Sequence, residues 1–465
     1  MKKSALSAIV AATLVFSAGC APDYLRQVGP SEAYYFGGKP VEAARLFLPY
    51  INAGGKDRLL FLMEAGLMLF TAENYRKSAD VLMSASRLLD KIPISATGEI
   101  GAMYTDDRLT NYRGQDFERV LVHMYLGLDF LMLDRPYDAR VEFKAVTNEL
   151  ERIRKETGRI YKQNIMAKYL NAIAHEMVGD MDKSEEDWEF ALIEFKQINM
   201  LRPGMPMVYR DMQRLAEKLR RGKNAKPAYS PGELIVVFEA GQTAVKQSRG
   251  RMLDGEFGAE VTATIAAASF GGGLTAASVL AGLSMAENPI PKFVRRSNRI
   301  AGLNIRANNQ YLGRTIMLED IENTAVRNLD DDYSRLRKRV AAGLATKVIT
   351  TVTMSIAAQV AAEAGARALE SQGGWAGLFG SLGRVAAQGV GPAVALATFS
   401  QIRPDLRCWR SLPANLQFQR FFLQPGNYVL TLEFVDRYGR VVRVEKDQVK
   451  IAAGKRSFKN FRTLY

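Results

Sequence analysis

Cysteine and histidine are scarce in this 465-residue chain, which contains two of each. Two cysteines cannot build the disulfide framework of a small secreted domain. Cys408 stands beside Trp409 in an apolar neighbourhood and is expected to be a buried thiol. The histidines, His123 and His175, stand in different helical segments and lack a nearby cluster of cysteines or carboxylates. His175-Glu176 begins like a zinc-protease motif, but no second histidine follows at the required spacing, so we expect no metal site.

Motifs of catalytic and nucleotide-binding sites are also missing. No Gly-Lys pair is followed by Ser or Thr, which excludes a P-loop. Gly271, Gly273 and Ala276 have the spacing of dinucleotide-binding glycines, but they lack a convincing strand before them and an acid after them. The triplet Asp330–Asp332 suits the start of a helix, and Ser381 lacks the spacing of a nucleophile elbow. We therefore expect no enzymatic activity and no cofactor.

The N-terminus lacks a hydrophobic run long enough to cross a bilayer. Lys2 and Lys3 precede an uncharged apolar run from Ala5 to Phe16, which is shorter than a membrane span. The run ends in Ser-Ala-Gly followed by Cys20, and small residues before a cysteine are typical of the cleavage site of a bacterial lipoprotein signal. The pattern predicts export and lipid attachment.

The expected processing defines the first two segments of the chain. Residues 1–19 are predicted to be the signal peptide, Cys20 the lipid-modified first residue of the mature protein, and residues 20–29 a tether. Ala21 stands where an inner-membrane retention signal has Asp, which predicts the outer membrane. The alternative is an ordinary secretory signal that is cleaved nearby.

The charge is strongly one-sided, with a formal net charge of +14. The segment from Arg202 to Lys226 contains eight Lys and Arg but only two acidic residues, and the segment from Arg437 to Arg462 contains nine and two. Such clusters favour anionic partners, for example lipopolysaccharide phosphates, lipid headgroups or acidic protein surfaces, unless they are simply solvated. An exported protein is not expected to meet nucleic acid.

Residues 30–225 show periodic apolar runs with short polar breaks, which predicts paired helices. Three stretches place small and large residues as in a tetratricopeptide repeat, a helix pair that stacks into an array. The signature positions are Gly66 and Tyr75 in the first unit, Gly127, Ala139 and Phe143 in the second, and Ala172, Gly179 and Trp188 in the third. Such arrays curl into a concave surface that binds peptides or helices. The alternative is an irregular bundle whose faces bury only one another.

Residues 230–465 change to strand-like patterns. Leu234–Phe238 is a continuous apolar run, and Tyr428–Phe434 alternates after a Pro-Gly turn. These patterns predict a small antiparallel β domain with helical insertions at about 257–286 and 319–400. Further strands are expected at Val441–Val444, at Val449–Ile451 and near 300–316. The expected fold class is therefore α+β, mostly α, with the repeat array first.

The insertions are rich in Ala and Gly. Val261–Ala286 contains 26 residues without a charge, which is long enough to cross a bilayer but weakly hydrophobic. Trp375–Ser400 carries five glycines that allow close helix contact, together with Arg384 and Pro392, which disfavour a simple span. We expect close-packed or surface-lying hairpins, and membrane insertion of 261–286 and 375–400 is the alternative.

The chain resembles a largely uncharacterised family of bacterial tetratricopeptide-like lipoproteins. Three stretches carry the resemblance: Tyr112–Val120, Gly232–Leu234 with the strand that follows, and Asp405–Pro413. The matching residues that we single out are Tyr112, Gly114, Glu118, Arg119, Trp409, Leu412 and Pro413. The resemblance implies an envelope location and repeat-mediated assembly, and it brings no catalytic residues. We expect 112–120 to open the second repeat, and Trp409 with Leu412 to anchor the helical insertion on the β domain.

The sequence as a whole predicts a lipid-anchored scaffold or assembly factor on the periplasmic face of the outer membrane. Its repeat groove would bind an envelope protein. Two alternatives remain open: a membrane-inserting component of an export or secretion assembly, and a regulator of cell-wall synthesis. Self-association is also open.

Overall fold

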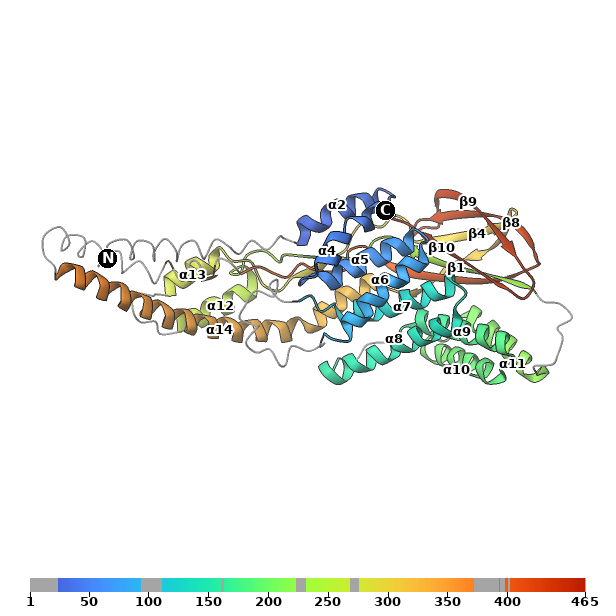
Figure 1. Ribbon diagram of the computed structural model, residues 1–465, viewed down its shortest axis with the longest axis horizontal. Coiled ribbons are helices and arrows are strands. Elements are labelled where there is room, and N and C mark those ends of the chain that lie inside the picture. Colours follow the sequence, from blue (N-terminus) through green and yellow to red (C-terminus); the bar gives the residue numbers. More distant parts are fainter. Residues whose placement is uncertain are drawn as a thin grey trace.

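The computed structural model describes residues 24–92, 111–159, 163–222, 231–267, 276–371, 393, 398–399 and 402–464. The predicted lipidation site Cys20 and most of the segment 375–400 lie outside these residues. The described part forms a body of helices and sheets from which a long helical arm extends (Figure 1). The α+β fold class, with the helical array first and the sheets after it, is confirmed.

The N-terminal half consists of stacked helices. They are α2 (Tyr24–Phe36), α3 (Pro40–Arg45), α4 (Leu48–Ala53), α5 (Arg58–Thr71), α6 (Tyr75–Leu89), α7 (Asp116–Met132), α8 (Pro136–Thr157), α9 (Ile165–Asp182), α10 (Glu185–Leu201) and α11 (Pro206–Arg221). The pairs α5–α6, α7–α8 and α9–α10 are the three predicted repeat units. The segment 20–29, predicted as a tether, becomes helical at Tyr24 because Tyr24 and Val28 are buried in the repeat core.

Small residues let the two helices of each unit touch. A Cβ atom added to Gly66 would lie 2.5 Å from the Leu82 side chain, and one added to Gly127 would lie 2.4 Å from the Phe143 ring. In the third unit, a Cβ on Gly179 would lie 2.4 Å from the Trp188 ring. The other signature residues are also in the helix contacts: Ala139 and Ala172 are fully buried, and Tyr75 packs edge-on against Phe70.

The C-terminal half forms two four-stranded sheets and a short ribbon. The first sheet has the order β10 (Arg456–Arg462), β1 (Gly232–Ala240), β7 (Asn415–Leu423), β6 (Ile316–Glu319). The second has the order β5 (Gln310–Arg314), β4 (Gly302–Ala307), β8 (Gly426–Val435), β9 (Val441–Ile451), and the ribbon pairs β2 (Val245–Gln247) with β3 (Lys292–Val294).

Two details of the sheets differ from the sequence prediction. The residues predicted as separate strands at Val441–Val444 and Val449–Ile451 form one strand, β9, because the residues between them also pair with β8; the register shifts only opposite Phe434 and Val435. The last strand, β10, pairs parallel to β1, so the domain is not purely antiparallel. All other paired strands are antiparallel within the described residues.

The first sheet is the middle layer of the body. All nine residues of β1 are buried. Ile235 and Val237 point to the helices and share the core of the repeat units, whereas Leu234 and Val236 share a second core with β4 and β8. The sequence of a strand that is buried on both faces is a continuous run of apolar residues, which is why this strand could be predicted.

The arm is built on α14 (Ile321–Glu370), which begins in the body and extends away from it (Figure 1). At its base α14 packs against the shorter helices α12 (Gly255–Ala267) and α13 (Ala276–Ser284). Val261 of α12, Leu283 of α13 and Leu344 and Val348 of α14 share one buried cluster. The described residues of 261–286 thus pack against the protein itself. Among the described residues, no helix combines the length and hydropathy that a membrane span requires.

Candidate protein-interaction surfaces

The inner surface of the repeat array is occupied by the chain itself. An extended segment, Asp405–Pro413, lies between the arm and β7, and we refer to it as the strap. The first helices of the units, α5 and α7, are buried along nearly all their length. Trp409 and Leu412 of the strap belong to the same buried core as these helices. The surface on which we expected a partner peptide therefore carries a peptide segment of the same molecule.

Two buried carboxylates hold the backbone of the strap. Glu118 of α7 accepts a hydrogen bond from the backbone N–H of Trp409 at 2.7 Å. Glu64 of α5 accepts from the N–H of Arg410 at 2.6 Å and from that of Ser411 at 3.1 Å. A buried carboxylate needs such donors to offset its desolvation. This main-chain recognition is the contact that a bound peptide would make.

Charged side chains of the strap also pair with residues at the start of α5 and in α2. Arg407 pairs with Asp57, the residue before α5, at 2.8 Å. Arg410 pairs with Glu32 of α2 at 2.8 Å. Arg407 is 5% exposed, so this pair is shielded from solvent, and removal of either partner would leave the other charge buried without it.

The structure places the two family-like motifs against each other. Tyr112 donates to the carboxylate of Glu118, and Glu118 also accepts from the backbone N–H of Gln115, closing the N-terminal end of α7. The expectation that this stretch opens the second repeat is confirmed. In the second motif, the strap, Trp409 and Leu412 share one buried core with strands β1 and β7, so the predicted contact with the β domain is present. The same residues also pack on the repeat helices, which was not predicted: the Trp409 ring lies 6.0 Å from that of Tyr125 in α7.

The remaining motif residues support the same junction. Gly114 has a positive φ of 76°, and a Cβ there would lie 3.1 Å from Arg119. Arg119 is 1% exposed and pairs with Glu149 of α8 at 2.6 Å. Pro413 is buried where the strap joins β7. Gly114 and Arg119 thus build the connection between repeat units, and the side chains of Arg119 and Pro413 are not presented to solvent.

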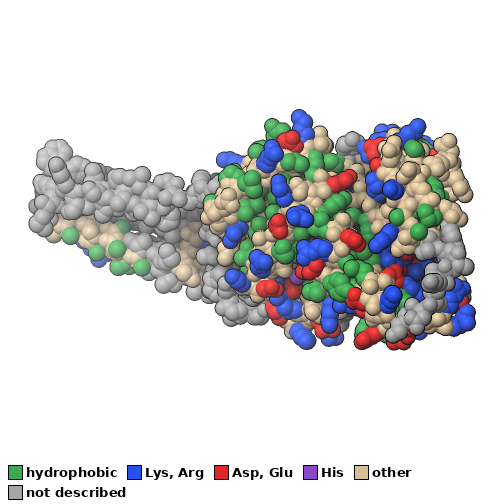
Figure 2. All heavy atoms as spheres, turned by 45° about the vertical axis from the view of Figure 1, so that its right-hand side comes forward, with side chains coloured by type: hydrophobic (Ala, Val, Ile, Leu, Met, Phe, Trp, Pro, Cys, Tyr) green, Lys and Arg blue, Asp and Glu red, His purple; other side chains and the backbone are tan. Residues whose placement is uncertain are grey.

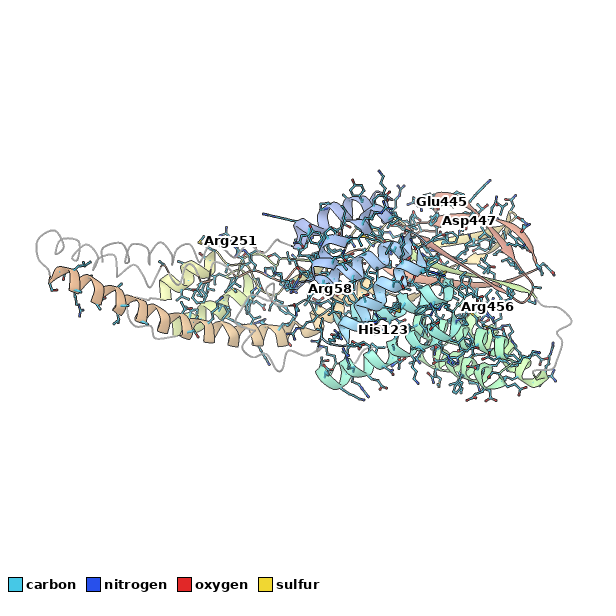
Figure 3. The ribbon with its side chains drawn as sticks, in the orientation of Figure 1. Arg58, His123, Arg251, Glu445, Asp447 and Arg456 are labelled. Carbon is cyan, nitrogen blue, oxygen red and sulfur yellow. The ribbon has the colours of Figure 1, made fainter. Side chains whose placement is uncertain are left out.

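A buried ion network joins the array to the first sheet. Arg420 of β7 is fully buried and contacts Glu176 of α9 at 2.5 Å, Glu233 of β1 at 2.6 Å and Asp211 of α11 at 3.5 Å. Arg456 of β10 lies between the sheet and the helices α9 and α11, where it pairs with Glu176 at 3.1 Å (Figure 3). The sequence analysis named Glu176 beside His175 and included Glu233 in a family-like stretch, but it did not predict the network, because the five residues come together only in the fold.

The network takes up part of the clustered positive charge. Burial alone would raise the pKa of Glu176, but Arg214, Arg420 and Arg456 hold that pKa well below its usual value. Asp180 also pairs with Arg456, at 2.9 Å, and with Lys218. The basic clusters that we expected to favour anionic partners are therefore partly neutralised inside the molecule.

Glu64 gives the strap a pH dependence that can be measured. Burial raises the pKa of Glu64 from 4.5 to about 7, although the donors at Ser411 and Arg410 oppose the rise. Its contribution to stability is therefore fully present below pH 4.5 and is lost as the pH rises through about 7. The difference in unfolding free energy between wild type and Glu64→Gln should change by up to about 1.4 kcal/mol per pH unit within this window.

Chemical denaturation between these pH values measures the effect. Glu151 lies exposed on α8, and Glu151→Gln is the matched control, for which the difference from wild type should stay constant. Parallel stability curves for wild type and Glu64→Gln would show that Glu64 does not titrate in this window.

The scarce histidines and the second cysteine occupy structural positions. His123 pairs with Glu142 at 2.8 Å and His175 pairs with Asp187 at 2.9 Å, each linking two helices (His123 is labelled in Figure 3). Cys408 is buried, and burial raises its pKa to about 11, so the thiol stays protonated. Within the described ranges, no group of three or more His, Cys, Asp and Glu side chains is placed to hold a metal ion.

The outer surface of the array carries exposed apolar side chains. We refer to this group as the outer patch: Tyr137 and Val141 of α8, Met181 at the end of α9, and Phe190 and Ile193 of α10. Val141 is 65% exposed, Phe190 45% and Ile193 46%. Figure 2 shows one face of the body, where hydrophobic side chains lie among Lys, Arg, Asp and Glu side chains.

Polar contacts join α8 to the other two helices of the outer patch, α9 and α10. Arg140 of α8 pairs with Asp187 of α10 at 2.5 Å, and Tyr137 donates to Asp182 at 2.5 Å. The sequence analysis missed the patch. Trp188 and Ala191 form the buried face of α10, whereas Phe190 and Ile193 lie three positions apart on its other face. A helix with apolar residues on both faces could have indicated an exposed apolar surface from the sequence alone.

Comparisons with known proteins add little. No family model and no curated protein matches the sequence. Among solved structures, the chain is similar to the MamA RS-1 ArsTM double mutant, with 14% identity, 43% of this chain and 94% of that chain covered, and a TM-score of 0.22. It is also similar to a tetratricopeptide repeat protein from Parabacteroides merdae, with 13% identity, 44% of this chain and 80% of that chain covered, and a TM-score of 0.15. At such TM-scores, the repeat assignment rests on the helix contacts described above.

Proposed function

We propose that the chain is a scaffold of the bacterial cell envelope that binds a protein partner through the outer patch. The patch carries the proposal because the inner surface of the repeats is already filled by the strap and the first sheet. Exposed apolar side chains grouped on neighbouring helices are candidates for protein contact.

The surroundings of the outer patch indicate the chemistry of the partner. Exposed acids lie beside it at Asp182, Glu186 and Glu189, although the whole chain carries a net charge of +14. An amphipathic helix with an apolar face and basic flanks complements this arrangement. Its apolar residues at helical spacing would pack on Phe190 and Ile193, and its Lys and Arg would face the acids.

The anchor of the scaffold is the predicted lipid on Cys20, which would place the protein on the periplasmic face of the outer membrane. Four residue steps separate Cys20 from Tyr24, the first described residue, and four residues span at most about 14 Å. Tyr24 is buried in the body. A lipid at Cys20 would therefore hold the body of the scaffold close to the membrane surface.

Site-specific photocrosslinking in cells tests the partner. A photoreactive residue at position 190 or 193 should yield an adduct with the same protein. The matched control is position 77, an exposed lysine on the second helix of the first unit, which should yield no such adduct. Introducing Phe190→Glu beside a crosslinker at position 193 should reduce the adduct by about tenfold or more, because apolar anchors dominate such interfaces.

Two results would contradict the proposal. Equal adducts from positions 77, 190 and 193 would show that the outer patch is not a specific contact. An adduct that persists in the Phe190→Glu variant would show that the apolar surface does not carry the binding.

A further inference from the structure

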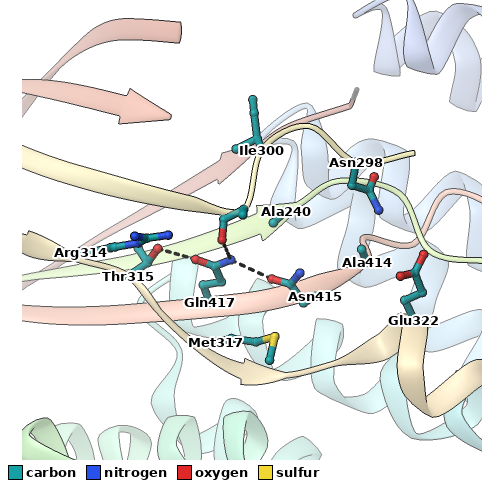
Figure 4. Close-up of a pocket in the computed structure, with 11 residues that line it drawn as sticks. Ala240, Asn298, Ile300, Arg314, Thr315, Met317, Glu322, Ala414, Asn415 and Gln417 are labelled. Carbon is teal, nitrogen blue, oxygen red and sulfur yellow. Dashed lines mark hydrogen bonds between the residues drawn. The ribbon is translucent and has the colours of Figure 1, made fainter. Parts of the chain in front are cut away.

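A pocket opens at the edge of the first sheet, beside the point where the strap leads into β7. Its volume is about 460 Å³, within the range of sites for small ligands. It is lined by the end of β1, the loop before β4, the turn from β5 to β6, the first residues of β7 and the first turn of α14 (Figure 4).

The two ends of the pocket carry opposite charges. Arg314 lies at one end and Glu322 at the other, with Gln417 and Asn415 between them (Figure 4). The Arg314 side chain has no carboxylate partner within the described part of the chain, and its guanidinium lies against Gly302, where an added Cβ would be 2.6 Å from Nη2. The backbone of Gly302 therefore supports the guanidinium at the pocket wall.

Glu322 has one free oxygen. Its Oε2 accepts from Arg295 at 2.8 Å, whereas Oε1 is buried and has no hydrogen-bond partner among the described residues. A buried carboxylate oxygen without a donor is costly. An N–H donor brought by a ligand would remove this cost.

The middle of the pocket is lined by the side-chain amides of Gln417 and Asn415. Thr315 donates to Oε1 of Gln417 at 2.6 Å, and Nε2 of Gln417 donates to Asn415 at 2.9 Å. These bonds fix both side chains. The Nδ2 group of Asn415 has no acceptor among the described residues and is free to donate to a carbonyl oxygen.

We propose that this pocket binds a short peptide with free ends, its carboxylate at Arg314, its ammonium group at Glu322 and a peptide carbonyl at Asn415. The backbone of Glu322 bonds to Ala414, and that of Arg314 accepts from the side chain of Gln419, five residues further along β7. Five steps of a strand span about 17 Å. Arg314 and Glu322 both line the pocket, so their charged groups lie closer together than their backbones. The space between the guanidinium and the carboxylate therefore suits an extended peptide of about three or four residues.

Calorimetric titration of the purified mature chain with tetra-alanine tests the proposal. Tetra-alanine is expected to bind with a Kd of about 1 mM or lower. Acetylation of its amino end and amidation of its carboxyl end should each weaken binding by about tenfold, because each removes a charge-assisted hydrogen bond. These three probes use the wild-type protein and do not depend on the folding of a variant.

Variants assign the two ends. Arg314→Gln should weaken the binding of tetra-alanine by about tenfold and leave the binding of the amidated peptide unchanged. Glu322→Gln should weaken the binding of tetra-alanine by about tenfold and leave the binding of the acetylated peptide unchanged. Arg437→Gln, at an exposed arginine outside the pocket, should have no effect. Absence of binding by tetra-alanine, or equal binding of free and blocked peptides, would overturn the proposal and leave a pocket that holds only water.

Discussion

Replacement of Arg420 by methionine is expected to lower the free energy of unfolding by about 3 to 5 kcal/mol. Arg420 is fully buried and contacts three carboxylates, Glu176, Asp211 and Glu233. Methionine has a similar length but no charge, so it would fill the space and leave the carboxylates with fewer donors. A buried charge without a partner lowers the free energy of unfolding by far more than an intact buried pair raises it.

Denaturant unfolding of the variant measures the loss, and two further variants interpret it. Arg306→Met removes an arginine that pairs with Glu433 at 2.8 Å but is 38% exposed, so its cost should stay below about 1 kcal/mol. The double variant Arg420→Met/Glu233→Gln should regain part of the stability because one of the uncompensated carboxylates is removed. A loss for Arg420→Met no larger than that for Arg306→Met would show that the network is solvated.

The repeat units could be predicted because their signal is local. Gly66 and Gly127 each precede the large residue that they contact by sixteen positions, and this spacing follows from one helix, a short turn and the facing helix. Strand β1 could be predicted for a similar reason, since burial on both faces leaves an unbroken apolar run. Both patterns lie within a single element or a pair of neighbours.

The strap, the ion network and β10 could not be predicted because their partners are distant in sequence. Glu118 and Trp409 were both recognised as motif residues, yet nothing in either stretch specifies that one binds the other. Strand β10 contains three basic residues and little alternation, and it becomes a strand because β1 offers it an edge. Asn415 and Arg314 meet in one pocket for the same reason.

The filled inner surface changes what the repeat array can do. The array and the first sheet share one core, and Glu176 of the array and Arg420 of the sheet share one ion network. The two halves should therefore unfold together rather than as separate domains. The outer patch is exposed among the described residues, so a partner that binds there would not need to displace the strap.

Replacement of Trp409 by alanine is expected to lower the free energy of unfolding by about 3 to 5 kcal/mol. The indole is 1% exposed and packs against Tyr125 of α7, so its removal leaves a large cavity in the repeat core. Its Nε1 group also donates to Ser411 within the strap, at 3.1 Å. The backbone N–H that binds Glu118 is retained in the variant, which separates the packing of the ring from the anchoring of the backbone.

Hydrogen exchange at the strap distinguishes a local from a global effect. The amides of Trp409, Arg410 and Ser411 donate to buried carboxylates and should exchange slowly in the wild type. In Trp409→Ala these three amides should exchange faster than those of β1, because the strap detaches before the sheet opens. Trp409→Phe keeps an aromatic ring and should cost much less than the alanine variant. If Trp409→Ala unfolded at nearly the wild-type denaturant concentration with slow strap amides, the carboxylates alone would hold the strap and the indole would be dispensable.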